Sequence, residues 1–248
     1  MSETSARTTF PSLTGFRETR LEGWRRVFAH VAPIFLLRGI ADVETQEMSS
    51  LSVEEVSERA RARGRAAWRP AFWPSPDLCP LRSPSPVPHP PSPQAPGCGC
   101  QVCAFETPMD ATELAAFVER EHEFRFVAVE VADDGMGDGA PRAGILCAAW
   151  SDAGYRDPIA GRCTEAEFAR RYLAHGVDRI WRDDVLPCPV YARHCVLASR
   201  RLSATAAASF LDETYLADRT TPLRAYLESN PHVMASEPPP ELVGRYSG

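Results

Sequence analysis

The sequence predicts an α+β protein, because strand-like segments dominate its first part, helical segments dominate its last third, and the two do not alternate regularly. Hydrophobic residues make up 44% and charged residues 24% of the 248 positions, which is enough to bury a core of ordinary size. One segment stands apart, since residues 56–101 hold eleven of the 23 prolines. Proline lacks an N–H donor and fixes φ, so no helix or sheet is expected to run through that segment.

The expected strands are segments rich in β-branched and aromatic residues, bounded by glycine or proline. The clearest is Phe124–Val131, which reads FRFVAVEV. The other expected strands are Arg20–Ala29, Val102–Glu106 and Gly144–Trp150. Residues 133–142 carry three glycines and a proline, which predicts a turn or loop between the last two strands.

The expected helices begin at capping residues. Asp110 is followed three residues later by Glu113, and Thr164 in the same way by Glu167, so each pair predicts a capping box at a helix start. An apolar stripe follows each box, as in an amphipathic helix. Two further helices are expected over Ala204–Leu216 and Leu223–Leu227.

Charge and cysteine content limit the class of protein. Acidic residues outnumber basic ones by 33 to 27, which argues against non-specific binding to nucleic acid or to an anionic membrane surface. All 27 basic residues are arginine, so chemistry that needs a lysine is excluded. The first twenty residues hold no apolar leader, and the longest apolar run, within residues 31–37, is too short to span a bilayer. Eight cysteines at this density are expected to be reduced thiols of a cytoplasmic protein.

Two groups of cysteines are weighed as reactive sites. The first has metal-ligand spacing and consists of Cys98, Cys100 and Cys103, with His89 upstream. Zinc sites of this kind need a second ligand pair nearby, and none follows, so no metal site is predicted. The second group, Cys188 with His194 and Cys195, is interpreted as packed core rather than as a Cys–His nucleophile, because no orienting acid lies near it in sequence.

An acidic cluster marks the junction between the first capped helix and the strand that follows. Glu119, Glu121 and Glu123 are spaced by two residues. If these carboxylates lie close together, repulsion is expected to raise the pKa of at least one of them, which makes a competent general base. The alternative interpretation is a solvated charged turn with Arg120 and Arg125 as counter-ions.

Three segments in this order resemble the gamma-glutamylcyclotransferase-like family. They are Leu21-Glu-Gly-Trp-Arg-Arg-Val-Phe-Ala-His30, Glu119-Arg-Glu-His-Glu-Phe-Arg125 and Asp178-Arg-Ile-Trp-Arg-Asp-Asp-Val-Leu-Pro-Cys-Pro-Val-Tyr191. The resemblance implies a mixed β-barrel with flanking helices and a helical C-terminal extension. It covers the chain outside the proline-rich segment.

The resemblance also implies an activity. Family members cyclise a γ-glutamyl compound to 5-oxoproline and release an amine or amino acid, a lyase- or transferase-type step of glutathione metabolism. The match of Val118-Glu-Arg-Glu-His122 makes Glu121 the expected general acid/base, with Glu119 and Glu123 as neighbours at the substrate site. The expected partner is a small γ-glutamyl substrate, and no metal or organic cofactor is required.

This sequence departs from the family in one motif. The family's Tyr-Gly-Ser-Leu loop, whose backbone N–H groups stabilise the oxyanion, is absent, and the chain begins with residues that resemble those just after that loop. The first strand of the barrel is therefore expected to be encoded upstream, and the chain without it to be poorly soluble because an edge is left unpaired. The alternative function is that of a catalytically inactive relative that acts as a binding or interaction protein.

The domain organisation follows from these observations. Residues 1–55 and 102–248 are expected to form a single gamma-glutamylcyclotransferase-like domain. Residues 56–101 are expected to be a disordered insertion or a translated, retained intron, since Val-Ser and Cys-Gln at its ends can be encoded as a splice donor and an acceptor.

Overall fold

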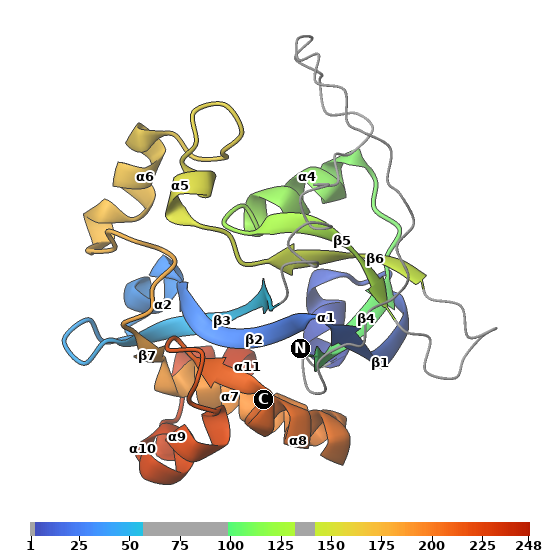
Figure 1. Ribbon diagram of the computed structural model, residues 1–248, viewed down its shortest axis with the longest axis vertical. Helices are drawn as coiled ribbons and strands as arrows, with labels where there is room; N and C mark the ends of the chain where they lie inside the picture. Colours follow the sequence, from blue (N-terminus) through green and yellow to red (C-terminus); the bar gives the residue numbers. More distant parts are fainter. Residues whose placement is uncertain (1–2, 57–98, 132–141) are drawn as a thin grey trace.

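The structure of the protein, a computed structural model, describes residues 3–56, 99–131 and 142–248 (Figure 1). Its architecture is α+β, as predicted, with a curled four-stranded sheet, two antiparallel strand pairs and several helices. None of the helices in these ranges has the length and apolar composition needed to cross a lipid bilayer. The loop expected at residues 133–142 lies outside the described residues, except for Arg142.

The strands form three sheets. The curled sheet has the order β7-β3-β2-β8, and the two pairs are β1-β4 and β5-β6. The strands are β1 (Thr14–Glu22), β2 (Trp24–Val31), β3 (Glu47–Glu55), β4 (Gly99–Glu106), β5 (Arg125–Val131), β6 (Arg142–Ala148), β7 (Leu186–Pro187) and β8 (Thr214–Leu216). The helices are α1 (Glu3–Thr9), α2 (Pro33–Leu37), α4 (Ala111–Arg120), α5 (Asp152–Tyr155), α6 (Glu165–Arg171), η1 (Leu173–His175), α7 (Pro189–Leu202), α8 (Ala204–Asp212), α9 (Leu223–Ser229), α10 (His232–Ala235), η2 (Pro240–Leu242) and α11 (Val243–Tyr246).

Strands β3 and β4 pair with β2 and β1, two strands that are consecutive along the chain. The antiparallel pairing of β3 with β2 runs to Glu55, and that of β4 with β1 starts at Gly99. Between the two pairs the Val56 N–H donates to the Gly23 carbonyl at 2.9 Å. The two strands therefore line up end to end along β1 and β2, and joining Val56 to Gly99 would give one strand in continuous register.

The boundary expected for the proline-rich segment is wrong at its C-terminal end. Residues 99–101 belong to β4 and pair with β1, whereas they were expected to lack structure. Cys100 is fully buried there. A strand needs a partner to form, and the partner β1 lies far away in sequence, so the local composition gives no sign of this pairing. Residues 57–98 of the segment lie outside the described residues.

The two capping boxes are confirmed, and one predicted helix is too long. Asp110 and Thr164 cap α4 and α6, and Glu113 and Glu167 return the second bond of each box. The helix expected over Ala204–Leu216 ends at Asp212, and its last residues form β8 instead. Strand β8 pairs in parallel with β2, so the long-range partner decides the conformation of these residues.

Strand β2 is the centre of the core, because both of its faces are covered (Figure 1). Val27, Ala29 and Val31 pack with side chains of α5, α6 and the segment that follows. Phe28 packs with side chains of α7 to α10. Helix α4 lies with β5 and β6 on the opposite side of the curled sheet from α7 to α10 (Figure 1). The residues that follow α4 come close to the C-terminal end of β2, where Glu123 lies next to His30.

Candidate active site at the end of helix α4

The three glutamates of the acidic cluster diverge where α4 passes into β5. The helix ends at Arg120, and Glu121 is its C-cap, with its N–H bonded to the Phe117 carbonyl. Because the backbone leaves the helix at this residue, Glu119, Glu121 and Glu123 do not share one face. Each of them has a different partner of opposite charge.

Glu119 lies on the surface. Its Oε1 accepts a hydrogen bond of 2.7 Å from Nη2 of Arg171, and its side chain is 67% exposed. The hydrogen bond from Arg171 lowers the pKa of Glu119. An exposed pair of this kind contributes about 1 kcal/mol or less to stability. Glu119 is therefore a surface link between α4 and α6.

Glu123 turns inward. Its Oε2 lies 2.6 Å from Nε2 of His30, and its Oε1 accepts a hydrogen bond of 2.7 Å from the Tyr172 hydroxyl. Burial would raise the pKa of Glu123, but the neighbouring His30 and the hydrogen bonds outweigh it, and the pKa is lowered. The expectation of a raised pKa is therefore wrong for both Glu119 and Glu123, because the backbone separates the carboxylates and gives each one a partner.

His30 reaches Glu123 because β2 is irregular at this point. The register of β2 and β3 shifts between Phe28 and His30, which places His30 opposite Ser50. Such an irregularity re-aims side chains along the strand. The imidazole ring packs between Phe124 and Trp181, with centroid distances of 4.8 Å to each. The ring is thus fixed by packing as well as by its polar contacts.

The Ser50 hydroxyl lies on the other side of the His30 ring from Glu123. Its oxygen is 2.6 Å from Nδ1 of His30, and it also donates to the His30 carbonyl at 3.2 Å. The other ring nitrogen, Nε2, faces Oε2 of Glu123. Both oxygens of Glu123 are engaged in this way.

The second half of the network runs from Glu123 to the surface. Arg171 Nη1 donates to Nε2 of His122 at 2.9 Å, so His122 carries its proton on Nδ1 and donates to the Tyr155 hydroxyl at 2.6 Å. Tyr155 in turn donates to Tyr172 at 3.0 Å, and Tyr172 donates to Glu123. Burial raises the pKa of both tyrosines, which keeps them protonated donors. We call this chain of residues, from Ser50 through Glu123 to Arg171, the inner network.

Most of the inner network could not be predicted from the sequence. Its members His30, Tyr155, Tyr172 and Arg171 lie on elements far apart along the chain. One signal was available, since His30 sits in an otherwise apolar strand end. A buried imidazole needs polar partners. The sequence does not show which residues those are.

The third glutamate, Glu121, lies between the inner network and the surface. Its Oε1 accepts a hydrogen bond of 2.8 Å from Nε of Arg120, and its side chain is 24% exposed. Among the described residues, Arg120 is the one hydrogen-bond partner of the Glu121 carboxylate. Glu121 is thus half-buried, and its carboxylate has spare hydrogen-bonding capacity.

The alternative interpretation of the cluster, a solvated turn with two arginines as counter-ions, holds for one of them. Arg120 pairs with Glu121, whereas Arg125 lies 3.1 Å from the buried Glu55 of β3 and also donates to the Ala149 carbonyl. Arg125 therefore ties β5 to the curled sheet and does not neutralise the cluster.

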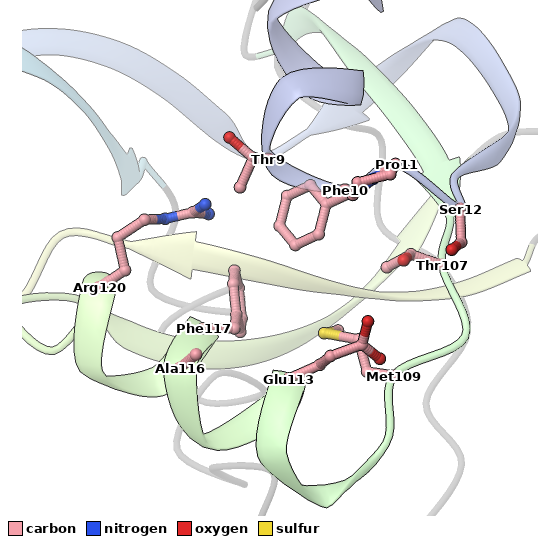
Figure 2. Close-up of a pocket in the computed structure, with 10 residues that line it drawn as sticks. All are labelled: Thr9, Phe10, Pro11, Ser12, Thr107, Met109, Glu113, Ala116, Phe117 and Arg120. Atoms are coloured by element: carbon pink, nitrogen blue, oxygen red, sulfur yellow. The ribbon is translucent and has the colours of Figure 1, made fainter.

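A pocket of about 220 Å³ opens between α4 and the segment that follows α1 (Figure 2). Phe10 and Phe117 form its apolar wall, and Arg120 stands at one end. The Arg120 guanidinium lies 5.0 Å from the Phe10 ring centroid and 5.6 Å from that of Phe117. Its Nε holds Glu121 while the group also lines the pocket, so one cation joins the pocket to the carboxylate.

Of the cysteines considered as a Cys–His nucleophile, Cys188 is buried and Cys195 is partly buried. Burial raises the pKa of Cys195 to about 11 and that of Cys188 to about 12, and it lowers the pKa of His194 to about 4. A thiol in this state is not a nucleophile near neutral pH, which agrees with the packed-core interpretation.

The cysteine group with metal-ligand spacing is described only in part. Cys100 and Cys103 lie on β4, while Cys98 and His89 are outside the described residues. Within the described part of the chain, no group of three or more His, Cys, Asp and Glu side chains is placed to hold a metal ion.

No family model, no curated protein and no solved structure matches the chain. The likeness to the gamma-glutamylcyclotransferase-like family therefore stays a prediction from its motifs.

Proposed function

We propose that the protein is a gamma-glutamylcyclotransferase-type enzyme with Glu121 as its general acid/base, and that its curled sheet is part of the family's mixed β-barrel. The observation that carries the proposal is the difference among the three carboxylates. Glu119 is exposed and paired, and Glu123 has both oxygens engaged. Glu121 is half-buried, its carboxylate has one hydrogen-bond partner among the described residues, and that partner, Arg120, lines a pocket.

The reaction suits a single carboxylate. The substrate's own α-amino group attacks its γ-carbonyl carbon, so the enzyme supplies a folded conformer rather than a nucleophile. Glu121 takes one proton from the α-ammonium group, and the resulting amine attacks the carbonyl carbon to close the ring. The ring nitrogen loses its second proton to solvent, and Glu121 returns the first proton to the leaving nitrogen as the old C–N bond breaks.

Arg120 places the substrate. Its Nη groups line the pocket while Nε holds Glu121, so a substrate α-carboxylate that pairs with Arg120 brings the adjacent α-ammonium to Glu121. The same pairing draws the guanidinium away from Glu121 and leaves this carboxylate free to accept the proton. A pocket of about 220 Å³ suits an amino-acid-sized group.

The test is release of 5-oxoproline from a panel that includes glutathione and γ-glutamyl amino acids. Glu121→Gln is nearly isosteric but cannot accept a proton, so turnover is expected to fall by roughly two to four powers of ten. Glu119→Gln is the matched control, because Glu119 lies two residues away on the surface, and it is expected to keep its activity. Full activity of Glu121→Gln would contradict the assignment.

A non-catalytic binding protein is the second candidate, and the Arg120–Glu121 pair favours it. A carboxylate neutralised by an adjacent guanidinium can serve as part of a recognition surface without transferring a proton. This candidate predicts that γ-glutamyl compounds bind at the pocket and that none of the panel is turned over. Calorimetric titration beside the 5-oxoproline assay separates the two functions.

A further inference from the structure

The pocket between α4 and the segment that follows α1 has an aromatic wall. Phe10 and Phe117 form this wall together, with ring centroids 5.8 Å apart (Figure 2). Phe10 also packs on Phe105 and Phe117 on Phe126, at centroid distances of 5.2 Å and 5.4 Å. Neither Phe10 nor Phe117 is fully buried. The pocket therefore presents two partly exposed rings that are held from behind by other rings.

The polar groups of the pocket are mostly able to donate hydrogen bonds. They are the Nη groups of Arg120 and the hydroxyls of Thr9, Ser12 and Thr107, and none of them has a hydrogen-bond partner among the described residues. A matching ligand offers carbonyl oxygens to these donors and needs few acceptors for N–H groups of its own. A proline residue has this property, because it keeps its carbonyl and lacks the backbone N–H.

Glu113 is the one acidic side chain that lines the pocket, and it keeps one oxygen for a ligand. Its Oε2 accepts the Asp110 N–H at 3.0 Å as part of the capping box. Among the described residues, its Oε1 has no hydrogen-bond partner. Figure 2 places this carboxylate beside Met109, at the end of the pocket away from Arg120. A cationic group of a ligand can therefore pair with it there.

The length of the pocket matches one turn of a polyproline II helix. Glu113 and Arg120 lie seven residues apart on α4, which is about 10 Å along the helix axis. A polyproline II helix has three residues per turn and rises 3.1 Å per residue, so one turn covers about 9 Å. One such turn can therefore reach from the Glu113 end to the Arg120 end, across the aromatic wall.

We propose that this pocket binds a proline-rich peptide in the polyproline II conformation. A basic residue of the peptide pairs with Glu113, proline rings pack on Phe10 and Phe117, and a peptide carbonyl accepts from Arg120. Aromatic-lined surfaces bind such peptides because a polyproline II helix is preformed and loses little conformational entropy on binding. The inference does not rest on the proposed function, since the binding is measured without turnover.

The probe is a synthetic peptide with the sequence of residues 82–93, RSPSPVPHPPSP, which holds one arginine and six prolines. Its binding to the full chain is measured by calorimetric titration. A matched peptide with alanine at every proline has the same charge, and it is expected to bind at least about tenfold more weakly because it is not preformed. A second host protein removes competition from the chain's own copy of this sequence. It carries Pro84→Ser, Pro86→Ser, Pro88→Ser, Pro90→Ser, Pro91→Ser and Pro93→Ser.

Variants of the pocket test where the probe binds. Glu113→Gln keeps the capping box and is expected to weaken binding about two- to fivefold, as for an exposed ion pair. It should leave unchanged the binding of a probe with glutamine in place of its arginine. Phe117→Leu keeps an apolar side chain but removes a ring, and it is expected to weaken binding of both probes about three- to tenfold. Glu119→Gln lies on α4 outside the pocket and is the matched control without effect.

The outcomes are clear-cut. Binding by either host that needs the prolines and is weakened by Glu113→Gln and Phe117→Leu supports the inference. Binding by the second host alone also supports it, because the chain's own prolines then compete for the same pocket. No binding by either host, equal binding of the proline and alanine peptides, or binding that neither pocket variant weakens would overturn it. None of these results depends on 5-oxoproline release, so the proposed function is tested separately.

Discussion

The two sides of the junction between α4 and β5 use similar residues in opposite ways. On the inner side, Glu123, His30 and the tyrosines are joined by short polar contacts among buried side chains. On the pocket side, Glu121 and Glu113 each keep an oxygen that no described residue occupies. A buried polar group costs stability unless it is paired, so the contacts of the inner side are expected to stabilise the fold. The pocket side is closer to solvent, so its carboxylate oxygens can stay without a protein partner and remain open to a ligand.

The largest expected effect is on the inner side, at the His30–Glu123 pair. Both side chains are buried, at 4% and 15% exposure. Glu123→Leu leaves the imidazole and the Tyr172 hydroxyl without their acceptor, so the free energy of unfolding is expected to fall by about 3–5 kcal/mol. Denaturant-induced unfolding measures this loss.

The double variant is the sharper test of the pair. In His30→Leu/Glu123→Leu neither side chain is left buried without the other, so the loss is expected to be well below the sum of the two single losses. Glu119→Gln, on the exposed side of the same turn, should cost about 1 kcal/mol or less. If Glu123→Leu is as mild as that control, the contrast between the two sides is wrong.

The next effect concerns the tyrosines. Tyr172→Phe removes the donor to Glu123 and the acceptor of Tyr155 while it keeps the ring in the core. A loss of about 1–3 kcal/mol is expected, because two buried polar groups lose a partner. Tyr226→Phe is a matched control, since its hydroxyl is buried without a hydrogen-bond partner in the described part of the chain. An equal loss in the two variants would contradict a role for Tyr172 in the network.

The sequence predicted local features of this junction well. The capping box of α4 and the strand that follows depend on residues within one segment, and both are confirmed. The directions of the three glutamate side chains depend on where the helix ends. Successive side chains are rotated by a different angle in a helix than in a strand. A one-residue change of that boundary would redirect Glu123 from His30.

Long-range partners explain what the sequence did not predict. Residues 99–101 and 214–216 became strands because β1 and β2 supply their partners, and no local pattern encodes such a partner. His30 meets Glu123 through an irregularity in the β2–β3 register. The pocket likewise needs Phe10 and Phe117 to meet, although they lie about a hundred residues apart, which composition and spacing do not reveal.

A smaller effect is expected in the pH dependence of stability, through His122. Burial lowers its pKa, and Arg171 and Arg162 add to the shift, while Glu123 and Glu119 oppose it. When pH falls below about 6.5, the unfolded chain takes up the proton before the folded protein does, so the free energy of unfolding decreases. His122→Gln keeps an acceptor for Arg171 without a titrating group, and its stability should change less between pH 7.5 and 5.5. A steeper dependence in the variant would contradict the neutral, Nδ1-protonated His122.

The smallest effect on stability is expected at Arg120, on the pocket side. Its guanidinium is stacked on two rings and paired with Glu121, but the side chain is 39% exposed, so Arg120→Gln should cost about 1 kcal/mol or less. Arg171→Gln is the matched variant on the inner side and should cost about 1–3 kcal/mol, because it leaves Nε2 of His122 without a donor. The order reverses for turnover of γ-glutamyl compounds, since Arg120 places the α-carboxylate and its loss should lower kcat/KM by about ten- to a hundredfold. Unfolding curves and initial rates on these two variants measure their ranking in stability and in turnover. A large stability loss in Arg120→Gln would show that the pocket side also stabilises the fold.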